Sequence, residues 1–291
     1  MHDEVRFRED LYRGSAWYYD RYRLPYPEVM VSDLARRARV SGHGRLLDLA
    51  CGTGQLAFPL GRWFGEVWAV DSEPDMAEAV RAKAAAAGAA GAAGIRPVVA
   101  KAETLRAEPG YFELAVIGNA FHRLDRELVA GRILGWLEPG GHLALCWSTS
   151  PWTGEAGWQR ALASALDRWQ AALGAGSRVP AGWELGRQRR PDPQVLSGAG
   201  FEPGGRHEFA VEHRWSLPQL AGHIRSTSFL PASVLGDRAA AFDADLAATL
   251  GPYSDGGTFT ETVEFAYELA RKPAPLPMAD GTFAGGEIKA Q

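Results

Sequence analysis

The sequence lacks the features that mark secreted, membrane-spanning and nucleic-acid-binding proteins. Two cysteines in 291 residues cannot form a disulfide framework, which favours a reducing compartment. No apolar run approaches the roughly 18 residues of a membrane-spanning helix. Residues 1–6 are charged and contain no apolar stretch of the kind that signal peptides need. A net charge of −4 gives no general attraction to nucleic acid or anionic membranes. These absences predict a soluble, cytoplasmic protein that binds neither nucleic acid nor membrane.

Little in the sequence indicates metal or hydrolytic chemistry. His122 and Asp125 are three residues apart, which places them on one helical face, but no third ligand lies nearby. The other candidates, His207, His213 and His223, have no recognised ligand spacing. A P-loop and a serine nucleophile elbow are also missing. We therefore predict no metal site.

What the sequence does contain is a strand, a glycine turn and a helix start at residues 45–57. The apolar run at 46–49 is typical of a central parallel strand that is buried on both faces. Gly52 and Gly54 allow a tight turn that a ligand can approach closely, and the following helix offers free N–H groups. Ala57 stands where the dinucleotide fingerprint places its third glycine, which weakens but does not remove a nicotinamide interpretation. Asp48 inside the strand favours a ligand with ammonium or hydroxyl groups over one with a diphosphate.

Strands alternating with helices across 45–147 predict a doubly wound, mostly parallel α/β sheet with right-handed crossovers. The predicted strands are 46–49, 66–71, 95–100, 112–117 and 142–147. Ligands bind beyond the carboxyl ends of such strands, where Cys51, Asp71 and the segments 101–103 and 119–122 all fall. Asp71 follows the glycine turn by one βα unit, which suits hydrogen bonding to both ribose hydroxyls of an adenosine. Ser72 is predicted to cap the next helix.

Aromatic residues gather in two places outside this core. Segment 17–27 holds four tyrosines and Trp17, and its paired prolines argue against a regular helix. It is either clamped onto the core or forms a lid over a cationic cofactor, because aromatic faces attract positive charge. Six of the ten tryptophans lie between 147 and 215. They either fill the core of a cap or line a broad, apolar substrate pocket.

These patterns predict seven segments. They are an N-terminal aromatic lid (1–40), a Rossmann-like cofactor-binding core (41–147), a helical cap insertion (148–192), a return to the core (193–215), a second cap insertion (216–255), a last core strand (256–271) and a disordered tail (272–291).

The pattern D-x-A-C-G-T-G-x-L at 48–56 resembles the first motif of class I methyltransferases that use S-adenosylmethionine (SAM). With the segment 19–27, the acid Asp71 and the segment 119–122, it makes residues 15–270 similar to bacterial small-molecule enzymes of the methyltransferase-11 type. The resemblance implies methyl transfer from SAM to an O, N or C nucleophile of a hydrophobic or aromatic small molecule. It also implies S-adenosylhomocysteine (SAH) as the product and a place in bacterial secondary metabolism.

The resemblance further implies which residues hold the cofactor. The methionine end would lie near Asp48 and Asn119, the ribose on Asp71, and the adenine between Met76 and the segment 102–103. Glu103 alternatively caps the next turn. Arg23 either meets the cofactor carboxylate or forms a structural salt bridge. The full set of predicted cofactor-binding residues is Tyr22, Arg23, Asp48, Ala50, Cys51, Gly52, Thr53, Gly54, Asp71, Ser72, Met76, Ala102, Glu103, Asn119, Ala120 and Phe121.

Methyl transfer needs a base only if the nucleophile must lose a proton. His122 is the best candidate, because an unperturbed histidine titrates near pKa 6.5. Alternatively, it hydrogen-bonds the substrate without accepting its proton. Tyr19 and Tyr22 would orient the substrate or stabilise developing charge.

Two other functions stay open. One is a catalytically inactive SAM-binding protein with a regulatory or assembly role, and the other is an NAD(P)-dependent oxidoreductase. The sequence does not specify the substrate, the methylated atom or the oligomeric state. In a homo-oligomer the aromatic lid would cover either its own subunit or a neighbour.

Overall fold

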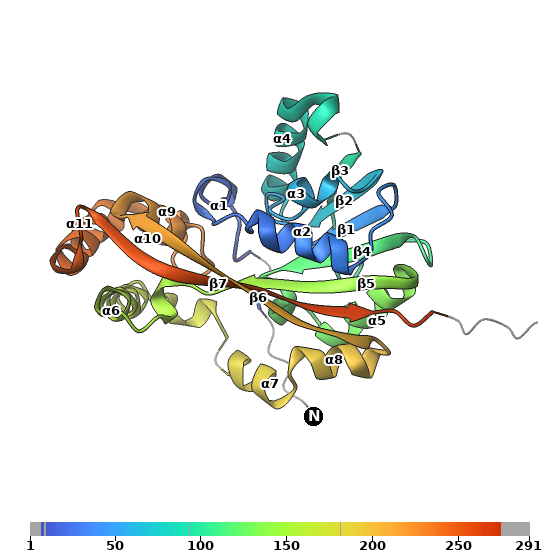
Figure 1. Cartoon of the computed structure of the whole chain (residues 1–291). Coiled ribbons are helices and arrows are strands. Elements are labelled where there is room, and N and C mark those ends of the chain that lie inside the picture. The colour runs from blue at the N-terminus through green and yellow to red at the C-terminus, as the bar shows by residue number, and fades with distance from the viewer. Residues whose placement is uncertain (1–6, 9, 93, 181, 275–291) are drawn as a thin grey trace, which may run out of the picture.

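The computed structural model of the chain describes residues 7–8, 10–92, 94–180 and 182–274. Its strands form one seven-stranded sheet in the order β3-β2-β1-β4-β5-β7-β6 (Figure 1). The strands are β1 (Arg45–Leu49), β2 (Glu66–Asp71), β3 (Ile95–Val99), β4 (Phe112–Gly118), β5 (Leu137–Ser148), β6 (Glu202–Ser216) and β7 (Thr258–Arg271). The α-helices are α1 (Ala16–Tyr22), α2 (Glu28–Arg37), α3 (Ala57–Gly61), α4 (Pro74–Ala92), α5 (Arg126–Trp136), α6 (Gly157–Ala172), α7 (Trp183–Arg189), α8 (Asp192–Ala199), α9 (Leu217–Arg225), α10 (Ala232–Leu235) and α11 (Ala239–Leu250).

The strand order reverses between β1 and β4. Strands β1 to β5 are parallel, and β7 runs antiparallel to both β5 and β6. From β1 the chain builds outward through β2 to β3, and then crosses to the other side of β1 to form β4 and β5. Such a switch point leaves a crevice at the carboxyl ends of the two central strands, where ligands bind in this class of fold. The predicted doubly wound, mostly parallel α/β fold is confirmed.

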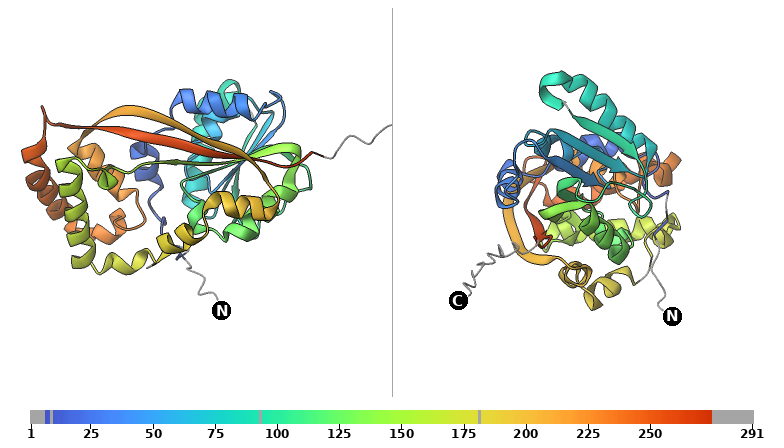
Figure 2. Two further views of the ribbon diagram at one scale, coloured as in Figure 1. Left: turned by 60° about the horizontal axis from the view of Figure 1, so that its bottom comes forward. Right: turned by 90° about the vertical axis from the view of Figure 1, so that its right-hand side faces the viewer.

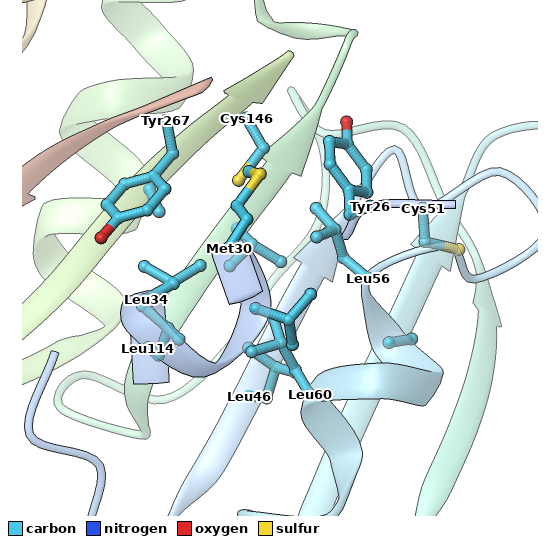
Figure 3. Close-up of a cluster of buried hydrophobic side chains, with 14 of the residues drawn as sticks. Tyr26, Met30, Leu34, Leu46, Cys51, Leu56, Leu60, Leu114, Cys146 and Tyr267 are labelled. Carbon is cyan, nitrogen blue, oxygen red and sulfur yellow. The ribbon is translucent and has the colours of Figure 1, made fainter. Parts of the chain in front are cut away.

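Alternating residues of β1 explain how both faces of the sheet are covered. Leu46 points to one face, where it packs with Met30 and Leu34 of α2 and with side chains of α3 (Figure 3). Leu47 points to the opposite face, toward α5 and α8, which contribute Ile133 among others. Burying each such leucine contributes about 1.5–3 kcal/mol. Neither face of this strand meets water, which is why every residue at 46–49 except Asp48 is a leucine.

The antiparallel pair of β6 and β7 is longer than the sheet that it joins (Figure 2). β7 pairs with β5 only as far as Phe265, whereas its pairing with β6 continues to Thr258 opposite Ser216. The half of this pair that does not contact β5 extends past the carboxyl ends of the parallel strands. There α6, α9 and α11 pack around it in a separate cluster of buried side chains that includes Trp215 and Phe242. The seven-segment division of the chain stays a prediction, and residues 275–291 of the predicted tail lie outside the described residues.

Two local predictions are wrong. The segment 17–27 begins with a regular helix, α1, because both of its prolines lie beyond the helix end. Arg23 is already extended (φ −71°, ψ 136°), so the helix stops before the restriction that Pro25 imposes on its predecessor. Ser72 does not stand at the start of a helix, since α4 begins at Pro74. Instead the carboxylate of Asp71 accepts the N–H of Glu73 at 2.9 Å.

None of the helices in the described ranges is long and apolar enough to cross a membrane.

Helices α1 and α9 cross in close contact at Gly222. A Cβ atom added there would lie 2.4 Å from Cγ of Tyr22. We expect Gly222→Ala to lower the free energy of unfolding by about 1–3 kcal/mol, because the ring must be displaced. Urea denaturation measures the change. Gly131→Ala in α5 is the matched control, since a Cβ there meets nothing within 4 Å and should stabilise the helix by about 0.5–1 kcal/mol. Equal effects of the two substitutions would contradict the close crossing.

Candidate functional site

Carboxylates from two strands hold the glycine turn after β1. Asp48 Oδ2 accepts the N–H of Ala57 at 2.8 Å and so fixes the start of α3. Asp71 Oδ2 accepts the N–H of Gly52 at 2.8 Å and ties the turn to the end of β2. Ala50 has a positive φ of 56°, a conformation that non-glycine residues keep only where the surrounding structure imposes it. The turn is therefore held firmly in one shape.

One side of α1 lies over this turn. A Cβ on Gly52 would come within 2.9 Å of Cε1 of Tyr19, so the tyrosine ring rests directly on the glycine. One helical turn later, the guanidinium of Arg23 lies 4.9 Å from the centre of the Tyr19 ring. Burial raises the pKa of Tyr19 to about 12, so its phenol stays protonated at neutral pH.

A cavity of about 540 Å³ adjoins the turn. It lies between the carboxyl ends of β1, β4 and β5, the aromatic segment, and the connector between α9 and α10. The predicted site residues in its wall are Tyr19, Arg23, Asp48, Ala50, Cys51, Asn119, Ala120, Phe121 and His122. Those outside its wall are Tyr22, Gly52, Thr53, Gly54, Asp71, Ser72, Met76, Ala102 and Glu103. The cavity therefore includes the predicted methionine end of the cofactor site and stops short of the adenosine end.

The adenosine side is covered by the chain itself. Gly14 N donates to Asp75 Oδ2 at 3.0 Å, which holds the residues before α1 against the start of α4. Met76 and Ala102 are both buried. Glu103 Oε1 accepts the N–H of Asp125 at 3.2 Å, so this oxygen is bound to the start of α5 rather than to the turn that follows Glu103.

Tyr22 does not reach the cavity, contrary to its predicted contacts with cofactor and substrate. Because α1 is helical, residues four apart share a side: Tyr19 and Arg23 face the turn, while Tyr18 and Tyr22 stack on each other at 6.1 Å. The Tyr22 ring packs against Gly222 of α9 instead.

The side chain of Asn119 is used within the protein. Asn119 has a φ of 51°; its Nδ2 donates to the Tyr26 hydroxyl at 3.1 Å, and its Oδ1 accepts the N–H of Ser148 at 3.3 Å. These bonds join the loop after β4 to the end of β5 and to the aromatic segment. Tyr26 lines the cavity, and burial raises its pKa well above the ordinary value, so its hydroxyl remains a donor. The sequence analysis missed Tyr26, since nothing in the pattern separates it from its neighbouring tyrosines.

His122 lies in the cavity wall with one ring nitrogen already occupied. Its Nε2 accepts a hydrogen bond from Arg123 Nε at 3.1 Å, which leaves the proton on Nδ1. Burial, and then the charges of Arg123, Arg187 and Arg126, lower its pKa to about 3. The occupied Nε2 and the lowered pKa argue against His122 as a general base, and its alternative role as a hydrogen-bond partner of the substrate stays a prediction.

This assignment can be tested without a substrate. We expect ¹⁵N-detected NMR of the imidazole nitrogens to show His122 as the Nδ1–H tautomer, with no titration between about pH 5 and 8. His122→Asn, which keeps a donor near the Nδ1 position, identifies the signals by their loss. Titration of His122 near its unperturbed pKa would restore it as a candidate base.

Arg23 meets the chemical requirement for binding a carboxylate. Its Nη2 donates to the backbone oxygen of Ser226 at 3.1 Å, and its Nε is buried without a hydrogen-bond partner. Within the described residues it forms no ion pair, so the structural salt bridge offered as its alternative role is not observed. A buried guanidinium nitrogen without an acceptor is costly, and a carboxylate beside it offsets that cost. The residues at this end of the cavity thus fit the methionine part of SAM.

The tryptophans between 147 and 215 divide between the two predicted roles. Trp158 and Trp169 lie in the cluster of α6, α9 and α11, while Trp147, Trp152 and Trp183 border the cavity, and Trp215 does both. In the part of the chain that the structure describes, no three His, Cys, Asp or Glu side chains are placed to hold a metal ion.

Comparisons with known proteins agree with this geometry. The methyltransferase domain family model matches residues 46–141. Uncharacterized methyltransferases of Mycobacterium tuberculosis and Mycobacterium bovis are 29% identical over 150 residues, which cover 52% of this chain and 56% of theirs. The chain thus spans about half the length of these relatives.

Solved structures share the fold. A Bacillus halodurans C-125 protein with a methyltransferase assignment has a TM-score of 0.52 at 18% identity, over 84% of this chain and 99% of that one. The (4+2)-cyclase SpnF has a TM-score of 0.50 at 22% identity, over 87% of this chain and 84% of its own. At such identities the likeness shows the fold alone.

Proposed function

We propose that this chain, which matches the methyltransferase domain family at residues 46–141, is a class I methyltransferase that methylates a small molecule. SAM is the proposed donor, and the proposed acceptor is an O, N or C atom of a hydrophobic or aromatic compound of bacterial secondary metabolism. The observation that carries the proposal is the firmly held glycine turn beside a cavity. Asp71 binds the N–H of Gly52 there, and Arg23 presents an unpartnered guanidinium nitrogen.

In this proposal the ribose and the methionine end of the cofactor each have a residue suited to them. Each carboxylate oxygen of Asp71 accepts one backbone N–H, from Gly52 or Glu73, and keeps a lone pair for a ribose hydroxyl. Arg23 receives the carboxylate of the methionine end. Tyr19 covers the turn, and its ring face attracts positive charge. When bound, SAM supplies an electrophilic methyl group on a positively charged sulfur.

The protein's own contribution is to align the reactants and exclude water. The nucleophile must lie in line with the methyl group, and orientation of this kind lowers a barrier without covalent catalysis. Buried side chains from the turn after β1, from β5 and from β6 enclose the cavity, namely Cys51, Cys146 and Trp215. Because His122 is held neutral with its lone pair occupied, the site favours an acceptor that needs no strong protein base.

Titration calorimetry with SAM, SAH and NADH tests the cofactor assignment. We expect binding of SAM and SAH and none of NADH; NADH binding without a response to SAM would support the oxidoreductase instead. Formation of SAH with a panel of aromatic small molecules then tests catalysis. Because a cyclase shares this fold, SAM binding without any methylated product would favour the catalytically inactive or repurposed alternative.

A further inference from the structure

A second arginine faces the cavity with an unpaired nitrogen. Arg123 follows β4 in the short 3₁₀ helix Phe121–Arg123 and lines the cavity wall. Its Nε donates to His122 Nε2 at 3.1 Å and its Nη2 donates to Ser228 Oγ at 3.3 Å. Its Nη1 is buried and has no hydrogen-bond partner. The guanidinium is thus fixed by its neighbours on two nitrogens, while the third is buried without an acceptor.

No carboxylate of the described residues forms an ion pair with this guanidinium. The acidic residues of the cavity wall are Asp48, Asp192 and Glu184. Asp48 is bound to Ala57 N at the glycine turn, and Asp192 is held between Arg126 and Arg187 at 2.8 Å from each. Glu184, on α7, is exposed to solvent and forms no ion pair with Arg123. A charged group that is removed from water without a counter-charge is unfavourable, so the wall lacks one negative charge at Arg123.

The surroundings of Arg123 are aromatic. Its guanidinium lies over the Tyr12 ring at 4.8 Å. Ser228, its hydrogen-bond partner, directly precedes Phe229, whose ring packs edge-on against Trp152 at 5.2 Å. His122, its other partner, lies 4.8 Å from the Trp183 ring. All of these side chains line the same cavity, so a flat ring bound there has aromatic partners next to an anion-binding nitrogen.

We propose that the acceptor substrate is an aromatic carboxylic acid whose carboxylate binds Arg123 and whose ring lies against Trp152 and Phe229. This inference rests on the proposed function, because it names the substrate class of the same cavity. Arg23 and Arg123 then have separate roles. Both arginines donate to the connector between α9 and α10, but only Arg23 lies on the ring that covers the glycine turn. Arg23 therefore serves the cofactor, and Arg123 serves the substrate.

Two probes of the same shape and different charge test the proposal on the full-length chain saturated with SAH. Calorimetry compares indole-3-acetic acid, which carries a carboxylate, with indole-3-acetamide, which does not. We expect the acid to bind at least about tenfold more tightly, as one charge-assisted hydrogen bond predicts. Arg123→Gln should remove this preference by weakening the acid alone, while SAH affinity stays unchanged. Arg123→Lys should keep part of the preference, since it retains the charge.

The matched control is Arg206→Gln. Arg206 lines the same cavity but forms an ion pair with Glu208 at 2.6 Å, so this variant should keep the full preference for the acid. Equal binding of acid and amide to the unaltered protein overturns the proposal. A loss of SAH affinity in Arg123→Gln that matches the loss for the acid also overturns it, because Arg123 would then hold the cofactor. Absence of any SAM or SAH binding is the separate result that defeats the proposed function itself.

Discussion

Asp71→Asn is expected to weaken SAH binding by about 100-fold. The two proposed hydrogen bonds from the ribose hydroxyls would no longer go to a charged acceptor, and such bonds are worth roughly 1.5–3 kcal/mol each. The amide oxygen can still accept one backbone N–H. The NH₂ group, however, replaces an oxygen that accepted the other N–H, so two donors meet there. The pKa of Asp71 is raised above its ordinary value, because burial outweighs the lowering effect of the N–H groups of Glu73 and Gly52. The carboxylate is thus already held by hydrogen bonds in the geometry that a ribose requires. Titration calorimetry gives the affinity, and circular dichroism verifies that the variant is folded.

Asp75→Asn is the matched control for this substitution. Asp75 is a second carboxylate at the same edge of the sheet, but its Oδ2 accepts the N–H of Gly14 from the segment before α1. The control should leave SAH affinity nearly unchanged, because the Asp75 side chain binds the segment before α1 and not the proposed ribose. A folded Asp71→Asn variant with unchanged SAH affinity would show that the ribose binds elsewhere.

Local patterns predicted the fold and the glycine turn because their causes are local. The strand at 46–49 is made of leucines apart from Asp48, and Gly52 and Gly54 adopt φ angles of 54° and 86° that few other residues tolerate. The convergence of the loops followed from the geometry of parallel strands. The bond from Gly52 N to the Asp71 carboxylate joins two of these loops directly.

The remaining features depend on contacts between segments far apart in the chain. Tyr19 lies over the turn and Tyr22 does not, because α9 occupies the other side of α1. Arg123 is separated by 105 positions from Ser228, which helps to fix it, and Tyr26 by 93 positions from Asn119. No periodicity or motif records such pairs. Single loops could consequently be placed from local patterns, whereas the contacts of α9 and its connector with the sheet edge could not.

Asp48→Asn is expected to make stability less dependent on pH. Asp48 is 1% exposed, and its pKa is raised from 3.8 to about 7, first by burial and then by Asp71, against the lowering effect of the Ala57 N–H. A carboxyl group whose pKa is raised by folding stabilises the native state while it is protonated, and this contribution is lost as the pH rises through about 7. The asparagine keeps the oxygen that accepts the Ala57 N–H and cannot ionise. Between about pH 4 and 8, the free energy of unfolding of the variant should therefore rise by up to about 4 kcal/mol relative to that of the unaltered protein.

Urea denaturation of both proteins across this pH range measures the difference, and a difference that does not change with pH would mean that Asp48 ionises freely in the folded protein. Saturating SAH adds a second test at about pH 8. An ammonium group bound near Asp48 favours its ionised form, so the ligand should stabilise the unaltered protein more than Asp48→Asn. Equal stabilisation of the two proteins by SAH would place the ammonium of the cofactor away from Asp48, and with it the methionine end of the site.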